Sequence, residues 1–187
     1  MALVVPAFDV AARLARALDE ASIPYAIGGA LALGVWAQPR GTHDVDLDVF
    51  VADDGLDAAL DAMETAGLVM DRQSAWKAHR EGGTLVGTCD NLRVDVFTPS
   101  IPFSWEAERT RVRLSGPAGP AWYLSAEATC VFKLLFFRPK DLLDLEKLIL
   151  VQGDRLDREY VRRWIVNMMG EDDERVVAWD RVAPRAG

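Results

Sequence analysis

The sequence predicts an α/β (α+β) protein with a mixed β-sheet covered by helices and a small C-terminal helical part. Alternating apolar and polar residues mark short strands in the first 120 residues, and apolar residues at helical spacing dominate after them. With 187 residues and 50% hydrophobic content, the chain is long enough for one good core. We expect a core over residues 1–120 and a helical region over 121–187 that packs on it.

The first fifth of the chain predicts a helix, a strand and a second helix. Phe8–Ala21 places apolar residues on one helical face, and Pro24 follows its end. The apolar run Tyr25–Ile27 predicts a strand that delivers Gly28-Gly29 to a turn, and Ala30–Trp36 predicts the next helix. Glycine permits close backbone approach, so free N–H groups at the start of that helix would form an anion site.

The following apolar run carries Asp44, Asp46 and Asp48 at alternate positions. In a strand these three carboxylates share one face, each about 6.6 Å from the last. A bound Mg²⁺ or Mn²⁺ would relieve their mutual repulsion, because these cations prefer carboxylate oxygens. Two simpler interpretations stay open: a Gly-Gly pair can be an ordinary turn, and alternate acids can form the solvated face of an edge strand.

The segment IGGALALGVWAQPRGTHDVDL resembles the polymerase-β-like nucleotidyltransferases, closest in pattern to the small bacterial AbiEii toxin-type and aminoglycoside/lincosamide enzymes. The resemblance implies a nucleotidyltransferase fold with residues 1–120 as catalytic core. It also implies that Asp44 and Asp46 bind the metal and that Gly28 and Gly29 bind the phosphates of an NTP. Arg40 and Thr42 match the family's Arg-x-Thr form and would contact the nucleotide. Asp48 lies outside the two-acid motif and would support the metal ligands.

The middle of the chain predicts one helix and several strands. A helix is expected over Leu56–Ala66, followed by three short β-like runs and a well-marked strand. These four expected strands are Leu68–Met70, Ser74–His79, Thr84–Gly87 and Leu92–Thr98. Asp95 lies on the last of them and matches the third carboxylate that the family takes from a later strand. Its alternative is an ion pair with Arg93.

Pro99–Glu108 predicts a loop with a short helical turn, where Phe103 and Trp105 could wall a nucleotide pocket or simply pack. Beyond it, three arginines alternate as if on one strand face: Arg109, Arg111 and Arg113. Such a row fits contact with a triphosphate or RNA, and it also fits a protected edge strand. The Gly116–Pro120 segment predicts the clearest boundary.

The C-terminal part predicts helices over Ala126–Arg138, Asp141–Val151 and Tyr160–Met169, and a last one reaching Trp179. Its segment ATCVFKLLFFRPKDLLDLEKL resembles one that follows the catalytic core in bacterial nucleotidyltransferases. The resemblance implies that Lys133 reaches the nucleotide phosphates, with Arg138 and Lys140 flanking it and Asp141 and Asp144 organising the helix junction. A lysine that extends to solvent along apolar neighbours is the alternative for Lys133.

Composition limits the partners. The net charge of −8 argues against a broad nucleic-acid-binding surface, and no apolar run reaches the length of a membrane span. The two cysteines lack zinc-type spacing, and the N-terminus lacks a basic leader region. We therefore expect a cytoplasmic protein with no membrane partner.

The predicted reaction leaves the acceptor open. A toxin or abortive-infection type enzyme would label tRNA or a protein and could have a cognate antitoxin. An enzyme akin to the aminoglycoside or lincosamide group would label a small molecule. The non-enzymatic alternative is an inactive nucleotide-binding module.

Overall fold

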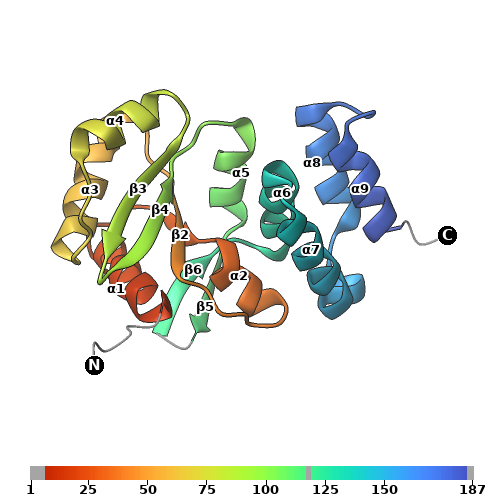
Figure 1. Cartoon of the computed structure of the whole chain (residues 1–187), viewed down its shortest axis with the longest axis horizontal. Helices are drawn as coiled ribbons and strands as arrows, with labels where there is room; N and C mark the ends of the chain where they lie inside the picture. The colour runs from red at the N-terminus through yellow and green to blue at the C-terminus, as the bar shows by residue number, and fades with distance from the viewer. Residues whose placement is uncertain (1–6, 117–118, 185–187) are drawn as a thin grey trace.

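The computed structural model describes residues 7–116 and 119–184 (Figure 1). In these residues six strands form one mixed sheet of order β3-β4-β2-β1-β6-β5. The strands are β1 (Tyr25–Ile27), β2 (Asp44–Val49), β3 (Thr84–Cys89), β4 (Leu92–Phe97), β5 (Val112–Gly116) and β6 (Gly119–Tyr123). The β2–β4 and β1–β6 pairs are parallel, and the other pairs are antiparallel.

Helices surround this sheet and make up the C-terminal part, which confirms the predicted fold class. The helices are α1 (Ala7–Glu20), α2 (Gly29–Trp36), α3 (Leu56–Thr65), α4 (Arg72–Arg80), α5 (Pro102–Thr110), α6 (Ala126–Phe136), α7 (Pro139–Gln152), α8 (Arg158–Met169) and α9 (Glu174–Val182). Figure 1 shows α6 to α9 gathered at the end of the molecule away from α1, α3 and α4.

Strand β2 organises the sheet because its two faces differ in chemistry. Val45, Leu47 and Val49 are fully buried in the core that the sheet shares with α1 and α3. Alternation therefore turns the three aspartates of β2 to the opposite face, as the sequence predicts. Burying the apolar face is what fixes the strand register, since a one-residue slip would put the carboxylates in the core.

A second core joins the helical part to the sheet. It includes Leu33 of α2, Phe103 of α5 and Trp179 of α9, all fully buried. Ser125 caps α6 by accepting a hydrogen bond from the Ala128 amide at 3.0 Å.

The predicted Gly116–Pro120 boundary joins two paired strands, β5 and β6, with residues 117 and 118 outside the described part. The division at residue 120 stays a prediction.

Two predictions about the middle of the chain are wrong, and a third holds at one residue only: Val69 makes an isolated bridge with Thr88, but Leu68–Met70 is not a strand. Ser74–His79 is not a strand but part of α4. Asp71 caps the N-terminus of this helix by accepting a hydrogen bond from the Ser74 amide at 2.8 Å. Capping residues satisfy amides that a helix start leaves free, so Asp71 overrides the weak β pattern. Residues 102–110 form the helix α5 rather than a loop, with Pro102 at its start.

The three alternating arginines do not share a strand face, because the chain changes from helix to strand between them. Arg109 lies in the last turn of α5 and binds Glu106 at 2.7 Å, whereas Arg113 lies on β5 and binds Asp19 at 3.2 Å. Arg111 lies between the two elements, with its guanidinium 4.6 Å from the Trp122 ring centroid. Each guanidinium thus has a local partner within the chain.

Phe103 and Trp105 do not wall a nucleotide pocket. Phe103 is fully buried and packs on Phe132 and Trp164, while the exposed Trp105 lies outside the main cavity.

Across residues 7–116 and 119–184, no helix has the length and apolar character needed to cross a membrane.

Candidate active site

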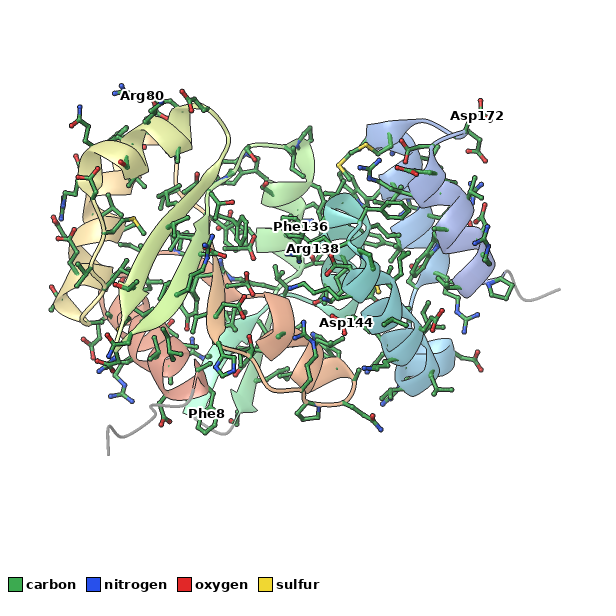
Figure 2. All side chains as sticks on the ribbon, in the orientation of Figure 1. Phe8, Arg80, Phe136, Arg138, Asp144 and Asp172 are labelled. Atoms are coloured by element: carbon green, nitrogen blue, oxygen red, sulfur yellow. The ribbon has the colours of Figure 1, made fainter. Side chains whose placement is uncertain are left out.

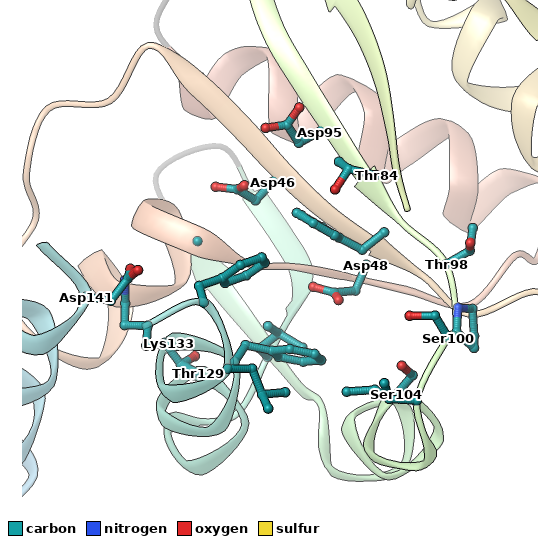
Figure 3. Close-up of a pocket in the computed structure, with 18 of the residues that line it drawn as sticks. Asp46, Asp48, Thr84, Asp95, Thr98, Ser100, Ser104, Thr129, Lys133 and Asp141 are labelled. Atoms are coloured by element: carbon teal, nitrogen blue, oxygen red, sulfur yellow. The ribbon is translucent and has the colours of Figure 1, made fainter. Parts of the chain in front are cut away.

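A cavity of about 810 Å³ lies between the carboxylate face of the sheet and helices α5, α6 and α8. Figure 3 shows Asp46, Asp48 and Asp95 on the sheet side of this cavity and Lys133 and Thr129 on α6. Residues from sequence segments far apart therefore meet in one space. This is the cavity in which we place the candidate site.

The Gly28-Gly29 pair lies directly against the carboxylate strand. The Gly28 amide donates a hydrogen bond to the Asp46 carbonyl at 2.9 Å, and Gly28 is the residue that precedes α2. Gly29 has a positive φ of +54°, and a Cβ there would lie 1.8 Å from Asp46 Oδ2. Only glycine fits this close approach. Because the Gly28 amide is already bonded, a phosphate would have to bind the following amides at the helix start.

Asp46 and Asp95 are direct neighbours across the parallel pair of strands β2 and β4. Asp44 Oδ1 accepts a short hydrogen bond from the Thr42 hydroxyl. Asp95 Oδ1 accepts a hydrogen bond from Arg93 Nε at 2.8 Å, so the alternative ion pair of the sequence is present. The three predicted carboxylates thus face one cavity, and two of them have partners within the chain.

The environment separates the pKa values of the acids on β2. Burial, together with the nearby charges of Asp44 and Asp95, raises the pKa of Asp46 to about 6. Burial and the charge of Asp46 also raise the pKa of Asp48 well above its ordinary value. The Thr42 hydrogen bond lowers the pKa of Asp44. At neutral pH this face carries concentrated negative charge, which favours binding of a cation.

Lys133 and Arg40 form ion pairs with buried aspartates. Lys133 Nζ lies 2.7 Å from Asp144 Oδ2 and 3.4 Å from Asp141 Oδ1, and Arg40 Nη2 lies 3.3 Å from the same Asp144 oxygen. Arg138 binds Asp141 at 2.6 Å. Figure 2 shows Arg138 and Asp144 beside α6 and α7, the junction that the sequence predicted. Both Lys133 and Arg40 still line the cavity.

The sequence reasoning missed most of the cavity wall. Aromatic side chains line it at Phe50, Phe97, Phe132 and Phe136, and hydroxyl groups line it at Thr84, Ser100, Ser104 and Thr129. Two of these residues could have been placed on this side by strand alternation, because Phe97 alternates with Asp95 along β4 and Phe50 follows Asp48 by two residues. Thr84 begins β3, whose pairing with β4 the sequence does not show, and the remaining residues come from loops and helices whose positions depend on tertiary packing.

Known structures share this arrangement of elements. The solution structure of the antibiotic-resistance factor ANT(2'')-Ia matches with a TM-score of 0.59 at 14% identity, over 88% of this chain and 94% of that one. Its crystal structure with adenylyl-2''-tobramycin matches with a TM-score of 0.58 at 16% identity, over 91% and 95% of the two chains. This chain has the nucleotidyltransferase fold. The predicted nucleotidyltransferase fold is confirmed.

A third structure with the nucleotidyltransferase fold agrees. An antigenic nucleotidyltransferase-like protein from Paracoccidioides brasiliensis matches with a TM-score of 0.51 at 19% identity, over 93% of this chain and 94% of that one. No protein-family model and no curated protein matches the sequence. The fold assignment therefore rests on the structural matches and on the short motif that predicts it, not on a match to a family model or to a curated protein.

The donor atoms of this nucleotidyltransferase fold suit a divalent cation. The donors are carboxylates, which Mg²⁺ and Mn²⁺ prefer, and the raised pKa of Asp46 reflects negative charge that a cation would offset. Across the described ranges, however, no three His, Cys, Asp or Glu side chains are arranged as a ready metal site. Asp44 and Asp95 would exchange their hydrogen bonds to Thr42 and Arg93 for the metal. Once these two hydrogen bonds are replaced, the carboxylates present fit a divalent cation.

Replacing Gly29 by alanine is expected to destabilise the fold by about 1–3 kcal/mol and to displace Asp46. The added Cβ would overlap Asp46 Oδ2, and the backbone has the positive φ that disfavours side chains. Urea unfolding and the rate of nucleotidyl transfer measure the two effects.

Gly153→Ala is the matched control for this substitution. Gly153 has a φ of +56°, close to that of Gly29, but a Cβ there meets nothing within 4 Å. We expect this variant to lose about 1–3 kcal/mol from the backbone conformation alone and to keep its activity. An active Gly29→Ala variant would show that the contact with Asp46 does not matter.

The metal-free protein is expected to gain stability from Asp46→Asn at pH 8, by about 1–2 kcal/mol. The pKa of Asp46 is raised in the folded state, so the folded protein holds this proton more tightly than the unfolded chain. Stability from this group therefore rises as pH falls through about 6, and the ionised form is unfavourable above it. Thermal unfolding in a chelator at pH 8 and pH 5 should show a gain that largely disappears at pH 5. An equal gain at both pH values would contradict the assigned cause.

Proposed function

We propose that this chain is a nucleotidyltransferase that moves a nucleoside monophosphate from an NTP to an acceptor hydroxyl, with Mg²⁺ or Mn²⁺ as cofactor. One observation carries the proposal. Asp44, Asp46 and Asp95 lie on two adjacent parallel strands and face a cavity beside the start of α2. Carboxylates on one side and helix amides on the other are the groups that a metal-bound triphosphate needs.

Each residue has a role in this proposal. The amides at the start of α2, from Gly29 onward, would bind the triphosphate, because Gly29 brings the helix start against Asp46. Arg40 and Lys133 would contribute positive charge near the phosphates while Asp144 holds their side chains in place. Thr42 would orient Asp44 through its hydroxyl.

The transfer itself forms one bond and breaks another. The acceptor oxygen attacks the α-phosphorus, the bond from that phosphorus to the pyrophosphate oxygen breaks, and the hydroxyl proton passes to Asp95. Mg²⁺ or Mn²⁺ held by Asp44, Asp46 and Asp95 would neutralise charge on the triphosphate and lower the pKa of the attacking hydroxyl.

We infer that the acceptor is a small molecule. The arginine row that favoured nucleic acid is dispersed over separate elements with partners of their own. A cavity of about 810 Å³ lies within the size range of small-molecule sites. In a structure of the same fold, the ligand is adenylyl-2''-tobramycin. A tRNA or protein acceptor is the alternative that the following experiment tests, and a cognate antitoxin and a cytoplasmic location stay predictions.

Labelled nucleotides test the proposal. Purified protein would be incubated with Mg²⁺ and each α-labelled NTP, alone, with tobramycin and with total tRNA, beside an Asp44→Ala, Asp46→Ala double variant. We expect label to pass to the small-molecule acceptor in the native protein and not in the variant. Label on tRNA would instead show that the acceptor is a nucleic acid. Binding of NTP without transfer to any acceptor would favour the inactive module, and no NTP binding at all would contradict the site.

A further inference from the structure

Asp48 is a buried carboxylate without a partner in the described part of the chain. Its residue is only 7% exposed, yet it lines the cavity, and Figure 3 shows its carboxylate pointing into that space. Asp44 and Asp95 have hydrogen-bond donors, from Thr42 and Arg93. Across residues 7–116 and 119–184, no hydrogen bond or ion pair reaches Asp48. A carboxyl group buried without a partner either keeps its proton or takes a positive charge from a ligand, so a cationic group entering the cavity could replace that proton and pair with Asp48.

The surroundings of Asp48 separate it from the basic part of the cavity. Lys133 lies on one side of Asp48 in Figure 3, paired with Asp141 and Asp144. On the other side the wall carries the hydroxyls of Ser100 and Ser104. Arg40, Arg138 and Lys140 also line the cavity near Lys133, so that part is basic and suits phosphates, whereas the part with hydroxyls and one carboxylate suits a different group.

The position of Asp48 relates that second group to the reaction. Asp46 and Asp48 are two residues apart on the same face of β2, so their Cα atoms are separated by about 6.6 Å. Gly28 closes the opposite side, because a Cβ on it would lie 2.9 Å from Asp48 Oδ2. A group bound to Asp48 thus lies beside the reacting centre and reaches it from the open cavity.

We propose that Asp48 is a specificity-determining residue that binds a protonated amine of the acceptor, so that the acceptor is an amino alcohol. This inference rests on the proposed function. A full positive charge suits the position better than a neutral N–H, because it compensates an ionised carboxylate that has no other donor in the described part of the chain. The hydroxyls of Ser100 and Ser104 would bind the polar groups next to that amine, and the rings of Phe97 and Phe132 would cover its apolar face.

Binding measurements without turnover test the assignment. The probes are tobramycin and fully N-acetylated tobramycin, which keeps the hydroxyls but lacks the positive charges. They would be titrated by calorimetry into the native protein, Asp48→Asn and Asp9→Asn. Asp9 is an exposed residue of α1 outside the cavity, so Asp9→Asn removes one negative charge without touching the site. Thermal unfolding of each variant confirms that it is folded.

The native protein and Asp9→Asn should bind tobramycin about tenfold or more tightly than the acetylated form. Asp48→Asn should bind tobramycin more weakly than the native protein by about the same factor. Affinity for each Mg²⁺-bound NTP should not change in Asp48→Asn. Equal binding of tobramycin to the native protein and Asp48→Asn, equal binding of the two probes, or no binding of either would overturn the proposal. A change confined to the preference among NTPs would assign Asp48 to the nucleobase and overturn it as well. Asp48-dependent binding without any nucleotidyl transfer would instead contradict only the proposed function.

Discussion

Asp46→Asn is expected to lower the rate of nucleotidyl transfer by a factor of about 10³ or more, because charge stabilisation by a bound metal contributes several kcal/mol to such reactions. Asp46 is the central acid of the site: Gly29 lies against its side chain, Asp95 lies across the strand pair, and Asp44 precedes it on the same face. Asparagine keeps the shape and removes the charge. The measurement is the single-turnover rate at saturating NTP and Mg²⁺.

The stability of the same variant distinguishes loss of chemistry from loss of fold. Because ionised Asp46 is unfavourable in the metal-free protein, Asp46→Asn should unfold at the same or a higher temperature than the native chain at pH 8. Asp9→Asn, on the exposed surface of α1, should keep activity and lose only about 0.3–1 kcal/mol of stability, because Asp9 lies in the first turn of that helix. A folded Asp46→Asn variant that retains more than about a tenth of the native rate would show that the reaction does not depend on this carboxylate.

Lys133→Met is expected to destabilise the protein by about 3 kcal/mol, since removing one member of a buried ion pair leaves the other charge without its compensation. Lys133 is 5% exposed, and its partners Asp141 and Asp144 are 0% and 2% exposed. Arg138 and Arg40 remain beside these acids, which places the loss at the lower end of the range for buried pairs. Urea unfolding at neutral pH measures it.

Two comparisons isolate the ion pair. Lys147→Met changes an exposed lysine of α7 and should alter stability by no more than about 0.5 kcal/mol. The double variant Lys133→Met, Asp144→Leu should lose less than the sum of its single variants, because two groups in contact do not contribute independently. A stable Lys133→Met variant that has lost NTP binding would instead mean that the lysine serves the phosphates alone.

The sequence predicts the carboxylate face well because that prediction depends on local geometry. Strand alternation places Asp44, Asp46 and Asp48 together whatever the rest of the chain does. The buried valines and leucine of β2 then decide which face they take. Asp95 follows by the same reasoning on β4, where it meets Asp46 in register.

Predictions that depended on weak patterns failed for identifiable reasons. The α4 segment is polar on average, but its few apolar residues gather on one helical face, where Ala75 is buried, and Asp71 caps its start; the sequence reasoning used neither signal. The arginine pattern required one element across residues 109–113, where the structure has a helix end and a strand start. The cavity wall formed by Ser100 and Ser104 depends on where α5 packs, which no local pattern encodes.

Crystals grown with Mn²⁺ and a non-hydrolysable NTP analogue offer the most direct test of the proposed site, through the anomalous scattering of the metal. We predict a manganese peak bound by Asp44 and Asp46, with Asp95 as a further ligand and the triphosphate at the start of α2. The hydrogen bonds from Thr42 to Asp44 and from Arg93 to Asp95 should then be broken. A fully bound nucleotide elsewhere, or no manganese at these carboxylates, would contradict the assignment of the active site.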